Sequence, residues 1–297
     1  MSDFQTYLGD LALRPLEDGA AASGLHCLAH QRQPGGVDLV ARASLRQMID
    51  HGERPRDLAK APLFISYYTP DTPYEGLAAA LRASLDRLGL EHRIEPVTSL
   101  GSWVANTGLK SAFIERVWQD SDRPVCWLDA DAELRRHPWF LYDNPADFAI
   151  VRRHGWYDIS SLVYLGRSAV TGRIISRWAD LCRLYPETWD QPLLTAAWFE
   201  VARDEALTSH FLPATIFRIP RPFLRDLRDQ LFYYPRKAKM RPFVDQKQAS
   251  RAHKSFMDRS APRKNERGSD DVSAPFRQAL SRFDFSRDFA VEAMFDR

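Results

Sequence analysis

The feature that most constrains the fold of this chain is a regular alternation of strand-like and helix-like segments between residues 63 and 203. Strand-like runs are rich in β-branched and aromatic residues, whereas helix-like runs repeat apolar residues every three or four positions. In chain order they are a strand at 63–68, a helix at 73–88, a strand at 92–97, a helix at 107–120, strands at 124–128, 146–152 and 162–165, helices at 168–185 and 190–203, and short strands near 211–212 and 215–219. Such alternation predicts an α/β domain with a mostly parallel central sheet flanked by helices.

Two carboxylates, Asp129 and Asp131, directly follow the apolar run at 124–128. In open α/β sheets, ligands bind just outside the carboxyl ends of the strands. Two neighbouring carboxylates are costly unless a cation or hydrogen-bond donors compensate them. Because Mg²⁺ and Mn²⁺ take one or two carboxylates together with phosphate oxygens, the pair predicts a divalent cation that carries a diphosphate. The alternative is an exposed Asp-rich turn.

Composition divides the chain into a main domain and two extensions. Residues 61–257 are predicted to form the α/β domain, and residues 1–60 form an N-terminal extension whose weak periodicity predicts no definite structure. Residues 258–275 are polar and charged, which is typical of a linker. Residues 276–297 are predicted to form a C-terminal amphipathic helix.

The overall composition is that of a globular protein in a reducing compartment. A hydrophobic share of 44% suffices for a sizeable core, and no apolar stretch reaches the length of a membrane span. No secretory signal is visible at the N-terminus. The three cysteines, Cys27, Cys126 and Cys182, are widely spaced and odd in number, so they predict neither a disulfide framework nor a zinc site. A cytoplasmic location is expected.

Positive charge is concentrated in residues 218–254, where eleven Lys or Arg face three Asp. That excess predicts an anionic partner such as phosphate, a membrane surface or nucleic acid. The alternative is a solvated basic face. Several enzyme classes are disfavoured, because the glycine-rich signatures of Rossmann and P-loop nucleotide sites and the serine elbow of α/β-hydrolases are absent.

Several stretches together resemble bacterial glycosyltransferases of the GT-A fold, which use nucleotide-diphospho-sugar donors. They are Leu63–Tyr68, Asn106-Thr107-Gly108-Leu109-Lys110 at a helix start, Pro124–Asp131 with its D-x-D motif, Trp178 with Asp190-Gln191, and Val244–Arg251. The resemblance covers about 63–254 and is most specific at 124–131. It implies a GT-A-like single domain, with N- and C-terminal extensions outside it.

The resemblance also assigns roles on the donor side. Asp131 would ligate Mn²⁺ or Mg²⁺, and Asp129 would contact the donor ribose or a metal-bound water and serve as the second metal-site carboxylate. Tyr67 and Thr69 would hold the nucleobase, although core packing is an equal alternative for Tyr67. Lys110, and Asn106 on the same helix start, would contact the donor, although a lysine on an exposed helix face is the simpler interpretation of Lys110.

Two further residues carry proposed catalytic or phosphate roles. Asp190 would orient the acceptor hydroxyl or act as the base, with a helix N-cap as the alternative. The family often has a histidine metal ligand before Gln-Ala-Ser-Arg, but Gln246-Lys247 occupy that region here. We therefore predict that Lys247 lies near the donor phosphates and partly replaces the histidine, which leaves the Mn²⁺ or Mg²⁺ requirement open.

The sequence thus predicts a glycosyltransferase that moves a sugar from a nucleotide-sugar donor to a glycan or lipid-linked glycan (glycolipid) acceptor. Two alternatives remain: a glycosyltransferase acting on a modified base of nucleic acid, and a non-catalytic GT-A-like binding module. A cytoplasmic protein, peripheral at the inner membrane face through the basic region 218–254, is the expected setting.

Overall fold

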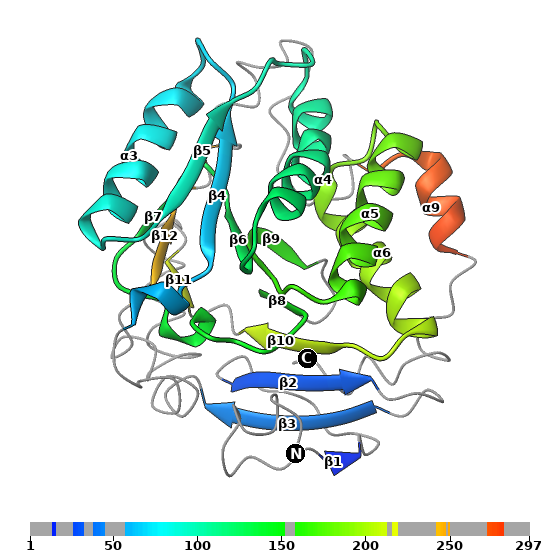
Figure 1. Ribbon diagram of the computed structural model, residues 1–297. Helices are drawn as coiled ribbons and strands as arrows, with labels where there is room; N and C mark the ends of the chain where they lie inside the picture. Colours follow the sequence, from blue (N-terminus) through cyan, green and yellow to red (C-terminus); the bar gives the residue numbers. More distant parts are fainter. Residues whose placement is uncertain are drawn as a thin grey trace, which may run out of the picture.

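The computed structural model describes residues 57–151, 158–212, 216–218, 242–247, 249 and 272–281, together with the backbone of three strands at 14–15, 26–32 and 38–44. The described residues form two sheets with helices packed on both faces of the larger one (Figure 1). None of the helices in this part of the chain combines the length and the apolar character that crossing a bilayer requires.

The larger sheet confirms the predicted α/β class. Its order is β1-β3-β2-β10-β8-β9-β6-β4-β5. The six strands that follow residue 60 are β4 (Leu63–Tyr68), β5 (His92–Pro96), β6 (Val125–Leu128), β8 (Phe148–Val151), β9 (Ile159–Leu165) and β10 (Thr208–Leu212). Of these, β9 alone pairs antiparallel with its neighbours β6 and β8, while the β4–β5, β4–β6 and β8–β10 pairs are parallel. Five of the six strands therefore run in one direction, which is the mostly parallel sheet that the sequence predicts.

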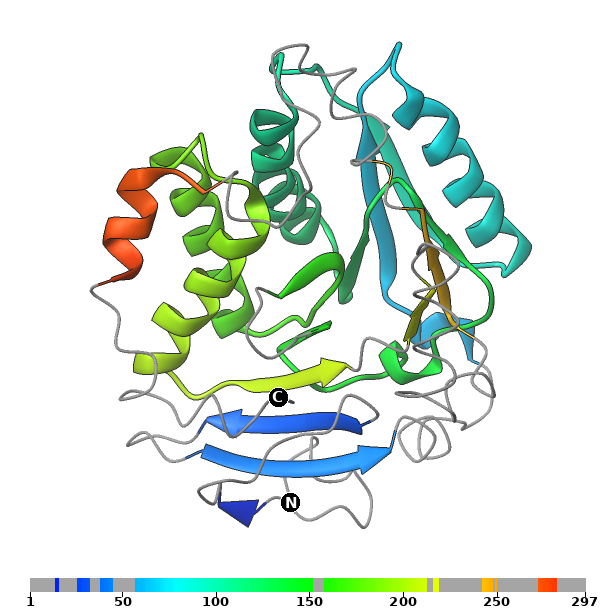
Figure 2. The same cartoon turned by 180° about the vertical axis from the view of Figure 1, so that it is seen from behind.

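The sheet continues into the N-terminal region for which the sequence predicts no definite structure. There β2 (His26–Arg32) pairs antiparallel with β10, β3 (Asp38–Ser44) pairs with β2, and β1 (Arg14–Pro15) pairs with β3. Figure 2 shows β2 and β3 side by side along β10. Strands on either side of residue 60 thus share one sheet.

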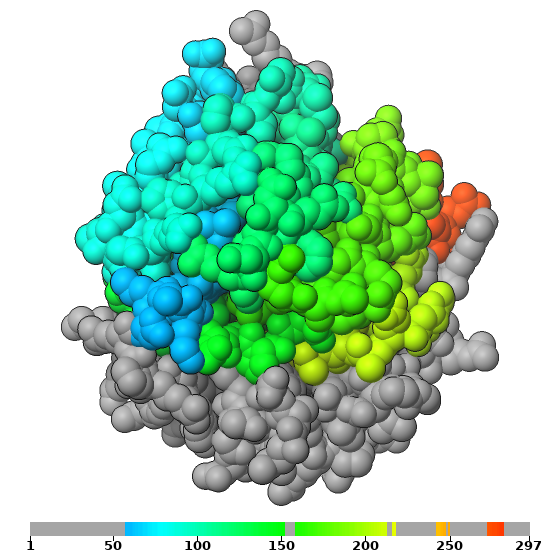
Figure 3. All heavy atoms as spheres, in the orientation of Figure 1, coloured from blue at the N-terminus to red at the C-terminus, as the bar shows by residue number. Residues whose placement is uncertain are grey.

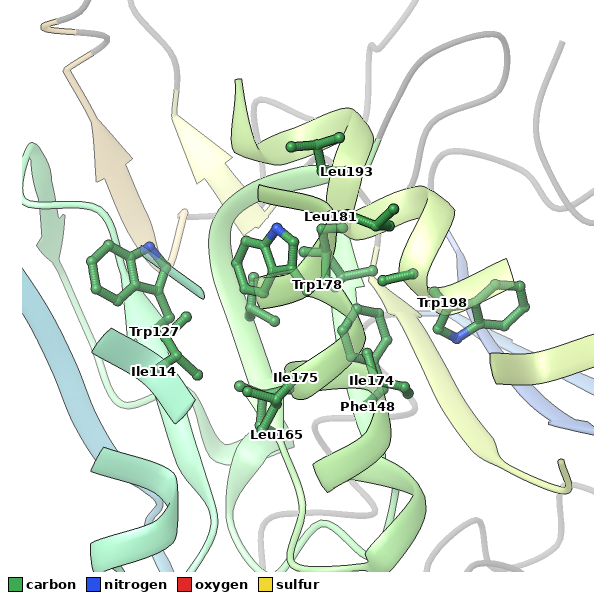
Figure 4. Close-up of a cluster of buried hydrophobic side chains, with 14 of the residues drawn as sticks. Ile114, Trp127, Phe148, Leu165, Ile174, Ile175, Trp178, Leu181, Leu193 and Trp198 are labelled. Atoms are coloured by element: carbon green, nitrogen blue, oxygen red, sulfur yellow. The ribbon is translucent and has the colours of Figure 1, made fainter. Parts of the chain in front are cut away.

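Alternation along the strands sends side chains to two separate cores. In β6, Val125 and Trp127 join one cluster, whereas Cys126 and Leu128 join the other. This two-residue period is what a strand buried on both faces requires. The first cluster also holds Trp178 and Trp198 from the helices on its side (Figure 4).

The helices cover the two faces unequally. On one face pack α4 (Trp103–Asp120), α5 (Ala169–Leu184), α6 (Asp190–Asp204) and α9 (Ala274–Leu280), and on the other packs α3 (Pro73–Arg87). Figure 3 shows α3 in cyan and α9 in orange on opposite flanks of the molecule. Helix α9 buries Phe276 against Tyr185, with ring centroids 5.1 Å apart. It begins inside the stretch predicted as a linker, and residues 282–297 of the predicted terminal helix lie outside the described part.

Local capping explains where the helices begin. Helix α3 begins as predicted, because the Thr72 hydroxyl accepts a hydrogen bond from the amide of Tyr74 at 3.2 Å. Gly89, with φ of +64°, follows the helix in the left-handed conformation that glycine allows. Helix α4 begins at Trp103 and not at residue 107 as predicted, because the Ser102 hydroxyl caps the amide of Ala105 at 3.1 Å.

A small second sheet brings a distant segment to the end of β6. It consists of β7 (Ala132–Leu134), β12 (Val244–Gln246) and β11 (Phe217–Arg218). Strand β12 pairs antiparallel with β7, and β11 pairs parallel with β12. Because β7 directly follows Asp131, this pairing places residues 244–247 and 249 next to Asp131, one of the two predicted metal-site carboxylates.

Candidate active site

The two carboxylates lie in a tight turn between β6 and β7. The amide of Asp129 donates to the carbonyl of Ser161 at 3.0 Å, and the amide of Ala132 donates to the carbonyl of Asp129 at 2.9 Å. The turn follows the carboxyl end of β6, next to that of the parallel strand β4. This is the edge of the sheet at which α/β proteins bind their ligands.

A buried lysine lies at the centre of the site. The Lys110 ammonium is 2.9 Å from Oδ1 of Asp129, 2.8 Å from Oδ2 of Asp190 and 3.1 Å from Oγ of Ser160. Its side chain is only 6% exposed. We call Lys110, Asp129, Ser160 and Asp190 the Lys110 cluster. The alternative of an exposed helix lysine is therefore wrong for Lys110.

The charge of Lys110 is secured by its neighbours. Burial by itself lowers the pKa of an ammonium, but the two carboxylates outweigh it and raise the pKa of Lys110 above its ordinary value. The face of the Trp127 ring also lies 5.2 Å from the ammonium. The site thus has a permanent internal cation at neutral pH.

Asp190 is the most enclosed member of the cluster, with a side chain 3% exposed. It is the first residue of α6, and its Oδ2 accepts hydrogen bonds from Lys110 and from the Ser160 hydroxyl, the latter at 2.8 Å. Burial raises the pKa of Asp190, and the charge of Asp129 adds to this, while Lys110 acts in the opposite direction. Its side chain is thus bound to the cluster and does not cap α6.

The two carboxylates of the D-x-D motif point to different partners. Asp129 is partly exposed: its Oδ1 accepts from Lys110 and from the indole of Trp127 at 2.8 Å, and its Oδ2 accepts from no described residue. Asp131 is buried and accepts from Nε2 of Gln246 at 2.5 Å and from the amide of Ala249 at 2.7 Å. Burial and the charge of Asp129 raise the pKa of Asp131 to about 6.

The end of β12 and the segment after it are attached to the motif by Gln246 and by the amides of Lys247 and Ala249, and not by the ammonium of Lys247. The amide of Lys247 donates to the carbonyl of Asp131 at 3.0 Å, but its ammonium pairs with Glu133. The Lys247 side chain is 42% exposed. The backbone of Lys247 thus lies beside the motif, whereas its ammonium is directed to Glu133 on β7.

The remaining predicted donor contacts lie around the end of β4. The Tyr67 hydroxyl donates to the carbonyl of Asn106 at 2.5 Å, and its ring packs against Trp127 at 5.1 Å between centroids. Burial, followed by the charge of Asp190, raises the pKa of Tyr67. Thr69 is buried, and its hydroxyl lies 3.0 Å from that of Thr72. The Asn106 side chain accepts from the amide of Leu100 at 2.7 Å and so holds the loop before α4.

Oxygen atoms of Asp129, Asp131 and Gln246 are of the kind that binds a divalent cation. The described residues contain no group of three His, Cys, Asp or Glu side chains that could hold a metal. They do contain the Asp129–Asp131 pair, whose mutual repulsion a cation would relieve. Oε1 of Gln246, on the amide that binds Asp131, is buried and has no hydrogen-bond partner in the described part of the chain. Two carboxylates and an amide oxygen are ligands that Mg²⁺ and Mn²⁺ accept.

Three contributors to the site were not predicted as site residues. Ser160 comes from β9, the indole of Trp127 from β6, and the amide of Gln246 from β12. Trp127 stands two residues before Asp129, so it lies on the same side of the strand, and that spacing could have suggested it. Nothing in the sequence marks Ser160, because its role depends on β9 running antiparallel beside β6. Most of the basic region 218–254 lies outside the described residues.

Comparison with known proteins gives structural similarity alone. No protein-family model and no curated protein matches the sequence. The fold is similar to a glycosyltransferase involved in the glycosylation of the major capsid of PBCV-1, with 16% identity, 67% of this chain and 99% of that chain covered, and a TM-score of 0.45. It is also similar to mouse xyloside xylosyltransferase 1, with 13% identity, 64% and 98% covered, and a TM-score of 0.37.

A third similar structure is the glycosyltransferase GlyE of Streptococcus pneumoniae TIGR4, with 12% identity, 77% of this chain and 62% of that chain covered, and a TM-score of 0.43. Identities and TM-scores of this size do not define a family. The function is therefore argued from the residues of the site.

Proposed function

We propose that this protein is a glycosyltransferase that moves a sugar from a nucleotide-sugar donor to a glycan or lipid-linked glycan acceptor. The observation that carries the proposal is the Lys110 cluster beside Asp131 at the carboxyl ends of β6 and β4. A buried cation between two carboxylates, next to a third carboxylate with a raised pKa, is costly to the fold. Buried charged groups with shifted pKa values are concentrated at functional sites, which supports the proposal.

The donor is proposed to bind with its diphosphate at the D-x-D turn and its nucleobase towards Tyr67 and Thr69. The free Oδ2 of Asp129, together with Asp131, would hold Mn²⁺ or Mg²⁺, with Oε1 of Gln246 as a further oxygen. When bound, such a cation would neutralise the charge that develops on the leaving nucleoside diphosphate. Lys247 remains a candidate phosphate contact if its pairing with Glu133 opens.

Within the protein, Lys110 keeps Asp129 and Asp190 in fixed positions. Two anions held by one buried ammonium are preorganised, so no rearrangement of these charges is needed when the substrates bind. Asp190 is the proposed group for the acceptor hydroxyl, because its Oδ1 accepts no hydrogen bond from the described residues. Its raised pKa matches a group that takes up a proton.

The proposal is tested by a thermal-shift screen of nucleotide sugars, with and without Mn²⁺, followed by a donor-hydrolysis assay of the best binder. A bound donor raises the melting temperature by mass action, whatever the acceptor is. Asp129→Asn should lose both the shift and the hydrolysis. The matched control is Asp143→Asn, an exposed aspartate that pairs with Lys60 at 2.7 Å, and it should behave as the unmutated protein. Equal loss in both variants, or no shift with any nucleotide sugar, would refute the proposal.

A second candidate function is a non-catalytic binding module. The observation in its favour is that both oxygens of Asp131 already accept hydrogen bonds, from Gln246 and Ala249. Under this alternative the D-x-D turn fastens the segment after β12 and holds no cation. Nucleotide-sugar binding that is independent of Mn²⁺, together with an absence of hydrolysis or transfer, would favour it over the enzyme.

The salt dependence of binding distinguishes a nucleic-acid acceptor from a glycan acceptor. If the basic region 218–254 binds a polyanion, affinity for DNA carrying modified bases should fall steeply with salt concentration, because counterions are released on binding. The same measurement on anionic lipid vesicles tests the proposed peripheral attachment to a cytoplasmic membrane face. Transfer to DNA and not to glycans would replace the glycan acceptor in the proposal.

A further inference from the structure

Two tryptophans stand at the starts of the helices that supply Lys110 and Asp190 to the cluster. Trp103 is the first residue of α4, and Trp189 immediately precedes Asp190 at the start of α6. Their ring centroids are 6.0 Å apart, with an interplanar angle of 35°. Both residues are partly exposed. We call this pair the tryptophan platform.

The helix geometry places the platform beside the reaction centre. Trp103 and Lys110 lie seven residues apart on one face of α4, so their Cα atoms are separated by about 10 Å along the axis. Trp189 is covalently joined to Asp190, whose carboxylate is 2.8 Å from the Lys110 ammonium. The platform is thus connected to the cluster through Asp190 and through one face of α4.

The chemistry of the platform suits a ring that has both apolar and hydroxyl surfaces. The indole faces offer flat apolar area, and Leu100, three residues before Trp103, is 59% exposed. The indole Nε1 of Trp189 is enclosed, yet it donates to no acceptor in the described structure. An enclosed indole N–H normally finds a partner, so a ligand hydroxyl that reached this ring would supply the acceptor that the described residues do not.

We propose that the tryptophan platform is a subsite for a pyranose ring of the acceptor glycan. A pyranose presents a face of C–H groups to an aromatic ring and hydroxyl oxygens at its edge, which matches both observations. This inference rests on the proposed glycosyltransferase function, and it assigns the acceptor side of that function to α4 and α6. A sugar held there would present its hydroxyl towards Asp190.

The loop before α4 supports the platform. The Asn106 side chain accepts from the amide of Leu100 and donates to the Ser99 hydroxyl at 3.0 Å, which closes the loop over the first turn of the helix. Gly101, with φ of +89°, supplies the left-handed turn that the loop needs. Asn106 is thus a positioning residue for Trp103, in addition to any contact with the donor.

The direct test uses simple sugars as probes. Saturation-transfer NMR is recorded on the full chain with methyl β-glucopyranoside, methyl β-galactopyranoside and methyl α-mannopyranoside, and with myo-inositol as a polyol that lacks the pyranose ring oxygen. The unmutated protein should saturate the ring C–H protons of at least one glycoside. The dissociation constant for that glycoside should rise about five- to tenfold in Trp103→Leu, and Trp103→Phe should recover most of the loss.

The matched control is Trp139→Leu, because Trp139 is also partly exposed but stacks on His137, with centroids 4.5 Å apart, in a separate aromatic group. That variant should bind the glycoside as the unmutated protein does. Absence of a signal from all three glycosides, a signal from inositol of equal strength, or equal loss in the two leucine variants would overturn the subsite.

A second measurement separates the acceptor from the donor sugar. If Trp103→Leu weakens the binding of a nucleotide sugar but leaves the binding of the nucleoside diphosphate unchanged, the platform holds the donor sugar and the acceptor assignment is wrong. Failure of the proposed function is distinguishable, because it appears as an absence of nucleotide-sugar binding in the unmutated protein. Loss of the glycoside subsite alone leaves nucleotide-sugar binding in place.

Discussion

Replacing Lys110 with methionine is the sharpest test of the buried cluster. Methionine has similar length and fits an apolar site, so the change removes charge more than volume. Asp190, whose side chain is 3% exposed, then loses its cation. Removing one partner of a buried ion pair costs about 3–5 kcal/mol, because an uncompensated buried charge remains. Most domains have only about 5–15 kcal/mol of unfolding free energy, so the loss is a large share of the total.

The double variant Lys110→Met with Asp190→Asn isolates the cause of that loss. It removes the orphaned charge as well, so it should recover most of the unfolding free energy. Lys247→Met is the matched control. The ammonium of Lys247 pairs with Glu133, and the Lys247 side chain is 42% exposed. Such an exposed pair contributes about 0–1 kcal/mol to the free energy of unfolding. All variants are measured by urea unfolding monitored by tryptophan fluorescence.

The pH dependence gives an independent check on the same variant. Burial raises the pKa of Asp190 in the folded state, and loss of the ammonium raises it further. An acid whose folded pKa exceeds its unfolded pKa destabilises the fold above the folded pKa, and the penalty vanishes as the pH falls towards the unfolded value. The gap between Lys110→Met and the unmutated protein should therefore be smaller near pH 5 than near pH 7. A loss below about 1 kcal/mol at pH 7, or a gap equal at the two pH values, would refute a buried charge cluster.

The remaining predictions concern the motif, the sheet and the C-terminal helix. Asp131→Asn should lower transfer by about 100-fold or more while near-ultraviolet circular dichroism stays native. Transfer at the level of the unmutated protein contradicts this. Gly166→Ala should lower the free energy of unfolding in urea by about 1–3 kcal/mol, because its Cβ would lie 2.6 Å from the carbonyl oxygen of Ala146. Gly76→Ala, which has open space in α3, should raise it by about 0.5–1 kcal/mol. The reverse order would show that the close approach at Gly166 is absent. Deleting residues 258–297 should lower the melting temperature, because Phe276 leaves the core, but nucleotide-sugar affinity should remain; lost affinity would place the tail in the donor site.

The sequence was most informative where local chemistry decides the structure. Strand β4 has its predicted bounds, and the Thr72 cap and Gly89 mark the two ends of α3 as expected. The turn that carries Asp129 and Asp131 follows β6 as predicted. In each case the signal lies within a few residues of the feature it determines, so periodicity and capping rules suffice.

The features that the sequence did not reveal depend on distant contacts. Strand β2 exists because its partner, β10, lies far along the chain at Thr208–Leu212. Lys110 resembles an ordinary helix lysine until β9 and α6 bring Ser160 and Asp190 to it. Gln246 reaches Asp131 across 115 positions. Pairings of this kind carry no local pattern, because the entropy cost of closing such loops is compensated only when the whole sheet forms.

The pairing of β2 with β10 has a consequence for solubility. Without the N-terminal strands, β10 would be an edge strand with a row of free amide and carbonyl groups, and such edges recruit other chains. In the described sheet the edge lies instead at β1, which is two residues long and ends in a proline that has no amide hydrogen. The opposite edge, β5, carries Arg93 and Glu95 and also ends in a proline. Both edge strands thus end in a residue that cannot donate a ladder hydrogen bond. A chain shortened to begin near residue 57 is expected to aggregate through the bare edge of β10.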